Sequence, residues 1–455
     1  MTEITSPVPA PPARGSLISA DEALARLLSA VAPSGRSEIV PTPEAWGRVL
    51  ARDVVSTVNV PPEDNSAMDG YALRLADLAD GAGSVLRISQ RIVAGRPGEP
   101  LQPGTAARIF TGAQVPAGAD AVVMQEHCEA LPGPGLGTVR VNELPPPGAA
   151  VRRQGEDVRL GHVVLHAGHR MDAAAIGLAA TVGMATLEVA ARPRVALFST
   201  GDELVMPGEP LPPGAIYNSN RFMLGALLRG QGCLVTDLGN VPDKLDATRA
   251  MLREAAHGHD LILSSGGVSV GEEDHLKPAL TAEGRLDLWA IAIKPGKPLA
   301  FGAVRHSADS AAPAAAARGH AGGGPKPVDD SPSDSTSGAG VTETWFVGLP
   351  GNPVSSHVTF TLFVRPLLAR LQGAQATWPA SVPLRADFAW PRPDKRREFL
   401  RVRRNATGGL DLYANQGSGV LTSLAWGDGL ADIAPGQAVE PGDTVRFLSL
   451  AELAP

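Results

Sequence analysis

The fold is decided by a run that reads RVALFSTGDE at residues 194–203, an apolar segment of strand length that ends in a polar turn. An apolar run followed by a polar loop recurs four more times before residue 354, and helical segments lie between most of the runs. Strands that alternate with helices are typical of an α/β domain with a largely parallel sheet. The sequence therefore predicts such a domain over residues 191–373.

Five loops follow these strands, and they carry glycines, hydroxyls, lysines and carboxylates rather than ordinary turn residues. They read TGDE at 200–203, NVPD at 240–243, SSGGVSVGEED at 264–274, KPGKP at 294–298 and LPGNP at 349–353. In an open parallel sheet, ligands bind outside the carboxyl ends of the strands, where such loops gather. We therefore expect the functional site at this edge of the sheet.

Each loop has a chemical interpretation and a plainer one. Glycines in SSGG let backbone amides approach a phosphate, but they also fit an ordinary turn. Lysines between prolines suit an oxyanion, and GNP at 351–353 suits an anion at a helix start. The carboxylates suit Mg²⁺, which favours carboxylates and substrate phosphate oxygens, although Asp202 or Asp243 could equally be a helix N-cap. The combination of phosphate, oxyanion and metal features is more specific than any one of them.

Composition excludes several classes of protein. The chain has 455 residues with a formal net charge of −7, and it contains 51 glycines, 41 prolines and only 2 cysteines. The acidic balance argues against nucleic-acid binding, which depends on Lys and Arg at phosphates. Two cysteines are too few for a disulfide framework, and the longest apolar stretch falls short of a membrane span. We therefore expect a cytoplasmic protein that binds neither nucleic acid nor membrane.

The whole chain is predicted to be a multidomain α/β plus β protein. Its segments are a disordered tail at 1–15, an N-terminal linker region with an inserted β-rich domain at 16–190, the α/β domain at 191–373 and a small β-barrel at 380–455. An Ala- and Leu-rich run at 19–31 predicts a helix with Ser19 as its N-cap. Residues 306–340 contain no aromatic residue, so they predict a disordered insertion in the α/β domain.

Polar residues also gather around glycines in the N-terminal region. They lie in DNSAMDG at 64–70, in TGA at 111–113 and in GED at 155–157. Such groups can be Asx-turns only. Their number in one region favours a second wall of the site.

A series of motifs resembles the molybdopterin molybdenumtransferases, bacterial enzymes related to the eukaryotic gephyrin E-domain. The motifs run in order through most of the chain: DNSAMDGYA (64–72), RIFTGA (108–113), VPAGADAVVMQE (115–126), RRQGEDV (152–158), FSTGDEL (198–204), IYNSN (216–220), SSGGVSVGEED (264–274), IKPGKP (293–298), GLPGNPVS (348–355), REFLRVR (397–403) and GSGVLTSL (417–424). The resemblance implies that molybdenum from molybdate is inserted into adenylylated molybdopterin, with release of AMP and with Mg²⁺ present. It also implies a homodimer whose cleft lies between the α/β domain of one subunit and the N-terminal region of the other.

The resemblance also implies roles for individual residues. The catalytic set is Asp64, Thr111, Asp157, Glu203, Asp243 and Asp274, of which Glu203, Asp243 and Asp274 would hold the metal. Residues that would bind the pterin substrate are Ser265, Gly266, Gly267, Ser269, Pro350, Gly351, Asn352 and Pro353. Lys294, Lys297, Arg401 and Ser423 are the implied molybdate contacts.

Two other functions remain open from the sequence. The α/β domain alone also resembles enzymes that adenylylate molybdopterin, but the DNSAMDG region and the C-terminal barrel favour the transferase. A non-catalytic scaffold of the same fold is the second alternative, and it could tolerate loss of the Asp and Lys motifs, which are intact here. The expected partners are a second copy of the chain, other molybdenum cofactor biosynthesis proteins and acceptor molybdoenzymes.

Overall fold

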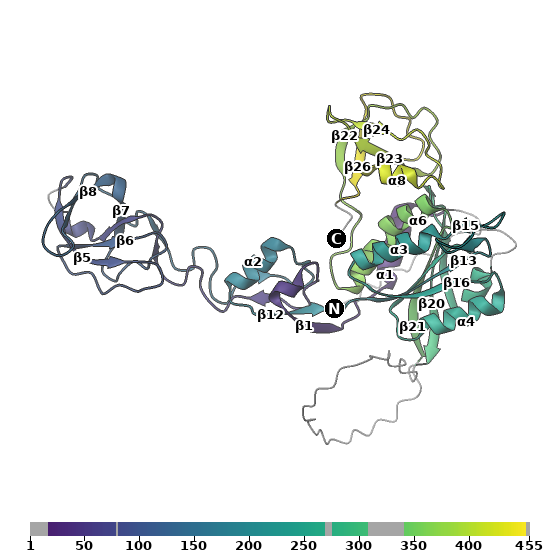
Figure 1. The fold of residues 1–455 in the computed structure, drawn as a ribbon, viewed down its shortest axis with the longest axis horizontal. Coiled ribbons are helices and arrows are strands. Elements are labelled where there is room, and N and C mark those ends of the chain that lie inside the picture. The colour runs from purple at the N-terminus through teal and green to yellow at the C-terminus, as the bar shows by residue number, and fades with distance from the viewer. Residues whose placement is uncertain (1–16, 79–80, 269–274, 308–340, 452–455) are drawn as a thin grey trace, which may run out of the picture. The chain divides into compact units, whose positions relative to one another are not determined.

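The computed structural model describes residues 17–78, 81–268, 275–307 and 341–451 (Figure 1). The chain divides into two compact units, one over residues 38–189 and the other over residues 1–37 and 190–455. The predicted tail at 1–15 and most of the predicted insertion lie outside the described residues. The predicted start of the insertion at residue 306 is wrong. His306 and Ser307 belong to strand β20 and pair with Thr342 and Val341 of strand β21.

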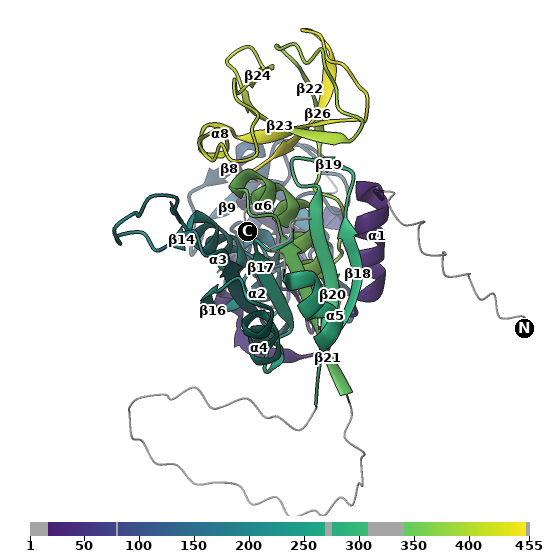
Figure 2. The same ribbon diagram turned by 90° about the vertical axis from the view of Figure 1, so that its right-hand side faces the viewer.

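The α/β domain is built on a six-stranded sheet in the order β16-β13-β17-β21-β20-β18. Its strands are β13 (Arg194–Thr200), β16 (Leu234–Val241), β17 (Leu261–Ser265), β18 (Gly284–Ala290), β20 (Pro298–Ser307) and β21 (Val341–Leu349). β16, β13, β17 and β21 run parallel, whereas β20 is antiparallel to both β21 and β18. β18 therefore points the same way as β21, and Figure 2 shows it beside β20. The five loops thus follow strands that end at one edge of the sheet.

Helices cover both faces of this sheet. α4 (Leu245–Ala256) and α5 (Leu276–Glu283) pack against side chains such as Phe198 and Ile262 on one face. The other face is covered by α1 (Ala20–Ala30), α3 (Ser219–Gly230), and a continuous run of α6 (Pro353–Thr359), a π-helix (Phe360–Val364) and α7 (Arg365–Leu371). Successive residues of a strand point to opposite faces, which explains why each apolar strand serves two cores.

Helix α1 confirms the predicted N-cap and alters the predicted grouping of the chain. The Ser19 Oγ atom accepts a hydrogen bond from the Glu22 amide at 3.1 Å. Ala20, Ala23, Leu24 and Leu27 are buried in the same core as α3 and α7. Residues 17–37 thus belong with the α/β domain rather than with the N-terminal region, because the apolar face of α1 is covered there.

The C-terminal domain is a sheet domain with its own core. Its elements are β22 (Val382–Arg385), β23 (Arg397–Arg404), β24 (Leu410–Leu412), α8 (Thr422–Trp426), β25 (Gly429–Ile433) and β26 (Thr444–Ser449). The short strand β19 (Ile293–Lys294) leaves the α/β domain and pairs with the start of β23. Arg397 at this junction forms ion pairs with Asp432 at 2.7 Å and with Asp21 of α1 at 3.2 Å. The pairing of β19 with β23 and the Arg397–Asp21 ion pair link the two domains, whereas the pair with Asp432 lies within the C-terminal domain.

The unit at 38–189 contains three clusters of buried apolar side chains. Its β-rich part is a sheet in the order β7-β4-β6-β5-β9-β8, with β4 (Gly70–Leu73), β5 (Val85–Ile92), β6 (Thr105–Ile109), β7 (Ala121–Met124), β8 (Cys128–Leu131) and β9 (Thr138–Val141). Its second part contains α2 (Ala173–Thr181), β1 (Ser37–Pro41), β2 (Val54–Val55), β11 (Val163–Leu165) and β12 (Thr186–Ala190). The strands β3 (Asn65–Ser66) and β10 (Val151–Arg152) pair with each other. The β-rich character predicted for this region is confirmed.

Within the described part of the chain, every helix is too short or too polar to cross a membrane.

Candidate active site

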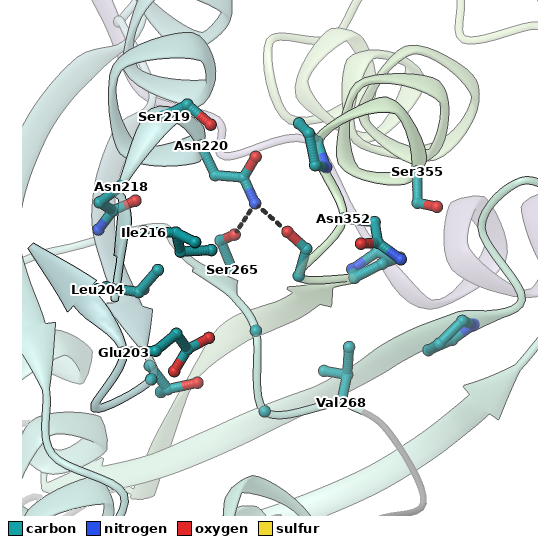
Figure 3. A pocket seen from close by; sticks show the side chains of 18 of the residues that line it. Glu203, Leu204, Ile216, Asn218, Ser219, Asn220, Ser265, Val268, Asn352 and Ser355 are labelled. Atoms are coloured by element: carbon teal, nitrogen blue, oxygen red, sulfur yellow. Dashed lines mark hydrogen bonds between the residues drawn. The ribbon is translucent and has the colours of Figure 1, made fainter. Parts of the chain in front are cut away.

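A cavity of about 480 Å³ opens at the edge of the α/β sheet where the parallel strands end (Figure 3). Four of the five predicted loops line it with side chains or backbone, and the fifth, at 294–298, contributes Pro298 alone. The remaining wall comes from β14 (Leu204–Val205), β15 (Ile216–Tyr217) and the start of α3. A pocket therefore lies at the edge of the sheet where the sequence predicts the functional site.

The SSGG loop depends on its two glycines. Gly266 and Gly267 have φ angles of +91° and +64°, a region that side chains other than glycine rarely adopt. A Cβ atom on Gly266 would lie 2.6 Å from the Thr200 carbonyl oxygen, and one on Gly267 would lie 2.8 Å from Thr200 Oγ1. The backbone of this loop can thus lie against β13 only because both positions lack a side chain.

The loop at 349–353 closes the opposite side of the pocket. Asn352 occupies the N-cap position of α6, but its side chain does not cap the helix. It donates instead to Ser418 Oγ of the C-terminal domain at 3.0 Å, and the Val354 amide donates to the Ser418 carbonyl at 3.0 Å. The C-terminal domain therefore positions this pocket loop.

Asn220 joins the SSGG loop to the loop at 349–353. Its Nδ2 atom donates to Ser265 Oγ at 2.8 Å and to the Gly351 carbonyl oxygen at 2.6 Å, as Figure 3 shows. Its neighbour Asn218 caps α3 by accepting a hydrogen bond from the Arg221 amide. Both asparagines are buried and line the pocket. The IYNSN motif is their signal in the sequence, but no role was predicted for them because the motif contains no charge or glycine.

Carboxylates gather on one side of the pocket. Glu203 and Asp243 both line it. The backbone amide of Asp202 donates to the Asp243 carboxylate, and the backbone amide of Asp243 donates to the Asp202 carboxylate. Burial is the main cause that raises the pKa of Asp243; the hydrogen bond from the Asp202 amide opposes it, and the negative charges of Asp202 and Glu203 add to it. Asp243 is not a helix N-cap, because α4 begins two residues later with Lys244 at its N-cap. Ser269 and Asp274 lie outside the described residues.

The two predicted lysines have different environments. Lys294 Nζ lies 3.1 Å from Glu398 and 3.6 Å from Asp394. Glu398 is 1% exposed and also accepts hydrogen bonds from the Trp390 indole at 2.9 Å and from the Asp394 amide at 2.8 Å. The charge of Lys294 is thus paired with the C-terminal domain.

Lys297 is exposed and lines a second cavity of about 700 Å³. That cavity also contains Asp394, Lys395 and Arg396. Among the described residues, neither Lys294 nor Lys297 lines the first pocket.

Arg401 and Ser423 lie in the interior of the C-terminal domain. Both are almost fully buried, and Arg401 Nε donates to Ser423 Oγ at 3.1 Å. The rest of the guanidinium donates to the carbonyls of Phe399 and Gly417. Burial lowers the pKa of Arg401 to about 10. Arg401 therefore supports the loop that carries Ser418, and neither residue lines the pocket described above.

The remaining predicted residues belong to the other unit. Asp64 accepts hydrogen bonds from the Gln154 amide at 2.8 Å and from Arg153 at 2.7 Å, and the pKa of its carboxyl is lowered chiefly by the first of these. Thr111 donates to Asp69 through both its amide and its hydroxyl. Asp157 is exposed, with its amide bonded to the Val60 carbonyl. Asp69 was not predicted as a site residue, although it belongs to the DNSAMDG motif.

Comparisons with known families cover nearly the whole chain. Residues 18–183 match the family described as MoeA N-terminal region (domain I and II), residues 196–370 match the probable molybdopterin binding domain, and residues 383–450 match the MoeA C-terminal region (domain IV).

Relatives and solved structures agree with these matches. The molybdopterin molybdenumtransferase of Haemophilus influenzae is 39% identical over 363 residues, which cover 80% of this chain and 79% of that protein. The molybdopterin molybdenumtransferase 2 of Mycobacterium tuberculosis is 36% identical and covers 91% and 95% of the two chains. A crystal structure of the molybdopterin biosynthesis moeA protein from Pyrococcus horikoshii OT3 matches with a TM-score of 0.77 and 26% identity, over 95% of this chain and 100% of that one.

Proposed function

Because the chain belongs to the molybdopterin molybdenumtransferase family, we propose that its α/β-domain pocket takes adenylylated molybdopterin and that molybdenum from molybdate is inserted there with release of AMP. The chain is a transferase of molybdenum cofactor biosynthesis. The observation that carries the proposal is the meeting of the SSGG loop, the loop at 349–353 and two carboxylates, Glu203 and Asp243, in one cavity. Phosphate groups need the first feature and a divalent cation needs the second.

Mg²⁺ fits the carboxylates of this pocket. The pKa of Asp243 is raised chiefly by burial and further by the charges of Asp202 and Glu203, and a hard cation would relieve the repulsion among these carboxylates. Within the described residues no group of three or more protein ligands is already arranged for a metal, and the predicted third carboxylate, Asp274, lies outside them. Glu203 and Asp243 would hold the ion together with substrate phosphate oxygens. Bound Mg²⁺ would supply neutralisation of phosphate charge.

The proposal extends to the assembly and to molybdate. Exposed apolar side chains next to the pocket support a homodimer, since Ile216, Tyr217 and Phe222 are between 43% and 55% exposed. Asp64, Thr111 and Asp157 would act in the cleft of a second subunit. Lys294, Lys297, Arg401 and Ser423 stay predicted molybdate contacts, and the cytoplasmic location stays a prediction. Other biosynthesis proteins and molybdoenzymes are the proposed further partners.

Release of AMP tests the proposed reaction. The full chain is mixed with adenylylated molybdopterin and Mg²⁺, and AMP is measured before and after molybdate is added. We expect release to depend on molybdate and to fall at least tenfold in Glu203→Ala, since this variant removes a predicted metal ligand. Glu209→Ala is the matched control, because Glu209 is a glutamate of the same segment that does not line the pocket. Absence of molybdate-dependent release from the unchanged protein would contradict the proposal.

A further inference from the structure

The backbone carbonyls of the pocket loop at 349–352 are all bonded to donors of the protein. The Leu349 carbonyl accepts from the Gly266 amide at 3.1 Å, and the Asn352 carbonyl accepts from the Ser356 amide at 2.9 Å. The Pro350 carbonyl accepts from the Ser356 hydroxyl, and the Gly351 carbonyl accepts from Asn220 Nδ2 at 2.6 Å. Carbonyl oxygens repel phosphate oxygens, so their engagement elsewhere removes an obstacle to an anionic ligand.

Asn220 also fixes how Ser265 can bond. The Ser265 hydroxyl accepts a hydrogen bond from Asn220 Nδ2 at 2.8 Å. Within the described residues it donates to no protein acceptor, and Ser265 lines the cavity while being 3% exposed. A hydroxyl has one proton to donate. Because its acceptor side is used by Asn220, that proton is available to a ligand in the pocket.

We propose that Asn220 is a positioning residue that makes the SSGG loop and the loop at 349–353 present hydrogen-bond donors to a phosphate group of the substrate. The side-chain amide reaches the two loops from α3 at once, and the Asn220 residue is 7% exposed. One side-chain nitrogen therefore turns away the Gly351 carbonyl and orients the Ser265 hydroxyl. This inference rests on the proposed function, because it assumes that a phosphate-bearing substrate occupies this pocket.

Two substitutions separate donor loss from donor reversal. Asn220→Ala removes both hydrogen bonds and should weaken binding of a phosphate-bearing ligand about tenfold. Asn220→Asp keeps the size of the side chain but puts an acceptor next to the Gly351 carbonyl and draws the Ser265 proton away from the pocket. It should weaken binding about a hundredfold, because a charge-assisted hydrogen bond now holds that proton.

Binding is measured with two pairs of probes that differ only in phosphate. The pairs are AMP with adenosine, and 6-hydroxymethylpterin phosphate with 6-hydroxymethylpterin, each titrated into the full chain by calorimetry or by pterin fluorescence. We expect both variants to lose affinity for a phosphorylated probe and to keep their affinity for its unphosphorylated partner. The pair that responds identifies which half of the substrate places its phosphate at these loops.

The pH dependence of Asn220→Asp adds a measurement that a general loss of structure would not alter. A buried aspartate beside a carbonyl has a raised pKa. When pH falls from 8 to 5, its protonation restores one donor, so affinity relative to the unchanged protein should recover. Asn220→Ala should show no recovery. Glu203, Asp243 and Tyr217, the titratable side chains that line the same pocket, are present in all three proteins, so the affinity of each variant is compared with that of the unchanged protein at the same pH.

Asn142→Asp is the matched control, because it adds the same charge at an exposed asparagine of the β-rich domain. Thermal unfolding shows whether each variant is folded, and Asn220→Ala serves if the aspartate variant is not. Equal binding of phosphorylated probes by Asn220→Ala and the unchanged protein would overturn the role of Asn220 and leave the proposed function standing. If the unchanged protein binds neither phosphorylated probe, the proposed function fails and this inference fails with it.

Discussion

One carboxylate oxygen of Asp69 accepts two hydrogen bonds from Thr111, from the backbone amide at 2.8 Å and from the side-chain hydroxyl at 2.8 Å. The hydrogen bond from the Thr111 amide is the main cause that lowers the pKa of Asp69, and the hydrogen bond from the Thr111 hydroxyl lowers it further. Asp69 therefore fixes both the backbone and the hydroxyl of a predicted catalytic residue. We expect Asp69→Ala to lower the rate of AMP release about tenfold or more, the usual cost of a charge-assisted hydrogen bond.

A double-mutant cycle tests whether Asp69 acts through Thr111. The rates of Asp69→Ala, Thr111→Ala and the double variant are compared with that of the unchanged protein. The double variant should be no slower than the slower single variant. Effects that multiply would instead mean that the two residues act independently.

Gly266 is expected to tolerate no side chain. Gly266→Ala places a Cβ atom 2.6 Å from the Thr200 carbonyl at a φ of +91°, so the SSGG loop must move away from β13. Gly232→Ala is the matched control, because Gly232 has a φ of +78° and nothing within 4 Å of its added Cβ. The control should lose about 1–2 kcal/mol of unfolding free energy from backbone strain alone. Gly266→Ala should lose more and should also bind AMP less tightly, whereas equal losses would show that the close contact has no effect.

Features with a strong local signal could be predicted from the sequence. The Ser19 N-cap, the apolar strands of the α/β sheet and the glycine-containing loops at their ends each depend on residues that are close in the chain. The direction of β20 could not be predicted, because an apolar run looks the same in a parallel and an antiparallel strand.

Contacts between distant residues were the part of the site that could not be predicted. Asn220 bonds to Ser265 and Gly351, which are 45 and 131 residues away. The loop of Lys294 suggests a cation for an oxyanion, and its ion pair with Glu398 of another domain could not be read from that loop. Such partners depend on packing between elements, which periodicity and spacing do not encode.

Lys294 and Lys297 should differ in their effects on stability. Lys294→Met removes the cation that lies 3.1 Å from the buried carboxylate of Glu398. Because the Lys294 side chain is 43% exposed, we expect a loss of about 1–2 kcal/mol in unfolding free energy, between the values for an exposed and a buried ion pair. Adding Glu398→Gln should recover much of it. Lys297→Met should leave the unfolding free energy nearly unchanged, because Lys297 is exposed. Urea unfolding of the four proteins checks this, and equal stability of the two lysine variants would contradict it.

His357 should make the protein sensitive to acid. Burial lowers its pKa to about 4, and its Nδ1 atom has no hydrogen-bond partner within the described residues. The unfolded chain takes up a proton near pH 6.5, but the folded chain does so only near pH 4. The free energy of unfolding therefore decreases as pH falls from about 6.5 to 4, by up to about 3 kcal/mol.

His357→Phe removes this titration and suits the apolar cavity that His357 shares with Met223, Leu227 and Phe360. Urea unfolding at pH 7 and pH 5 should show a smaller acid-dependent loss for the variant than for the unchanged protein. The same loss in both proteins would mean that other groups cause the acid sensitivity.

Asp202 should control the acid limit of activity through Asp243. The pKa of Asp243 is raised by burial and then by the like charges of Asp202 and Glu203, so Asp243 becomes protonated at a higher pH than an ordinary aspartate. Protonation removes a predicted metal ligand, and activity should fall below that pH.

Asp202→Asn removes one like charge and keeps the backbone amide that donates to Asp243. The pKa of Asp243 should then fall, and the acid limb of the AMP-release profile should move to lower pH. Asp237→Asn is the control, because Asp237 lies in strand β16, which precedes Asp243, and does not line the pocket. This variant should leave the acid limb in place. A shift to higher pH in Asp202→Asn would show that Asp202 acts on Asp243 by something other than its charge.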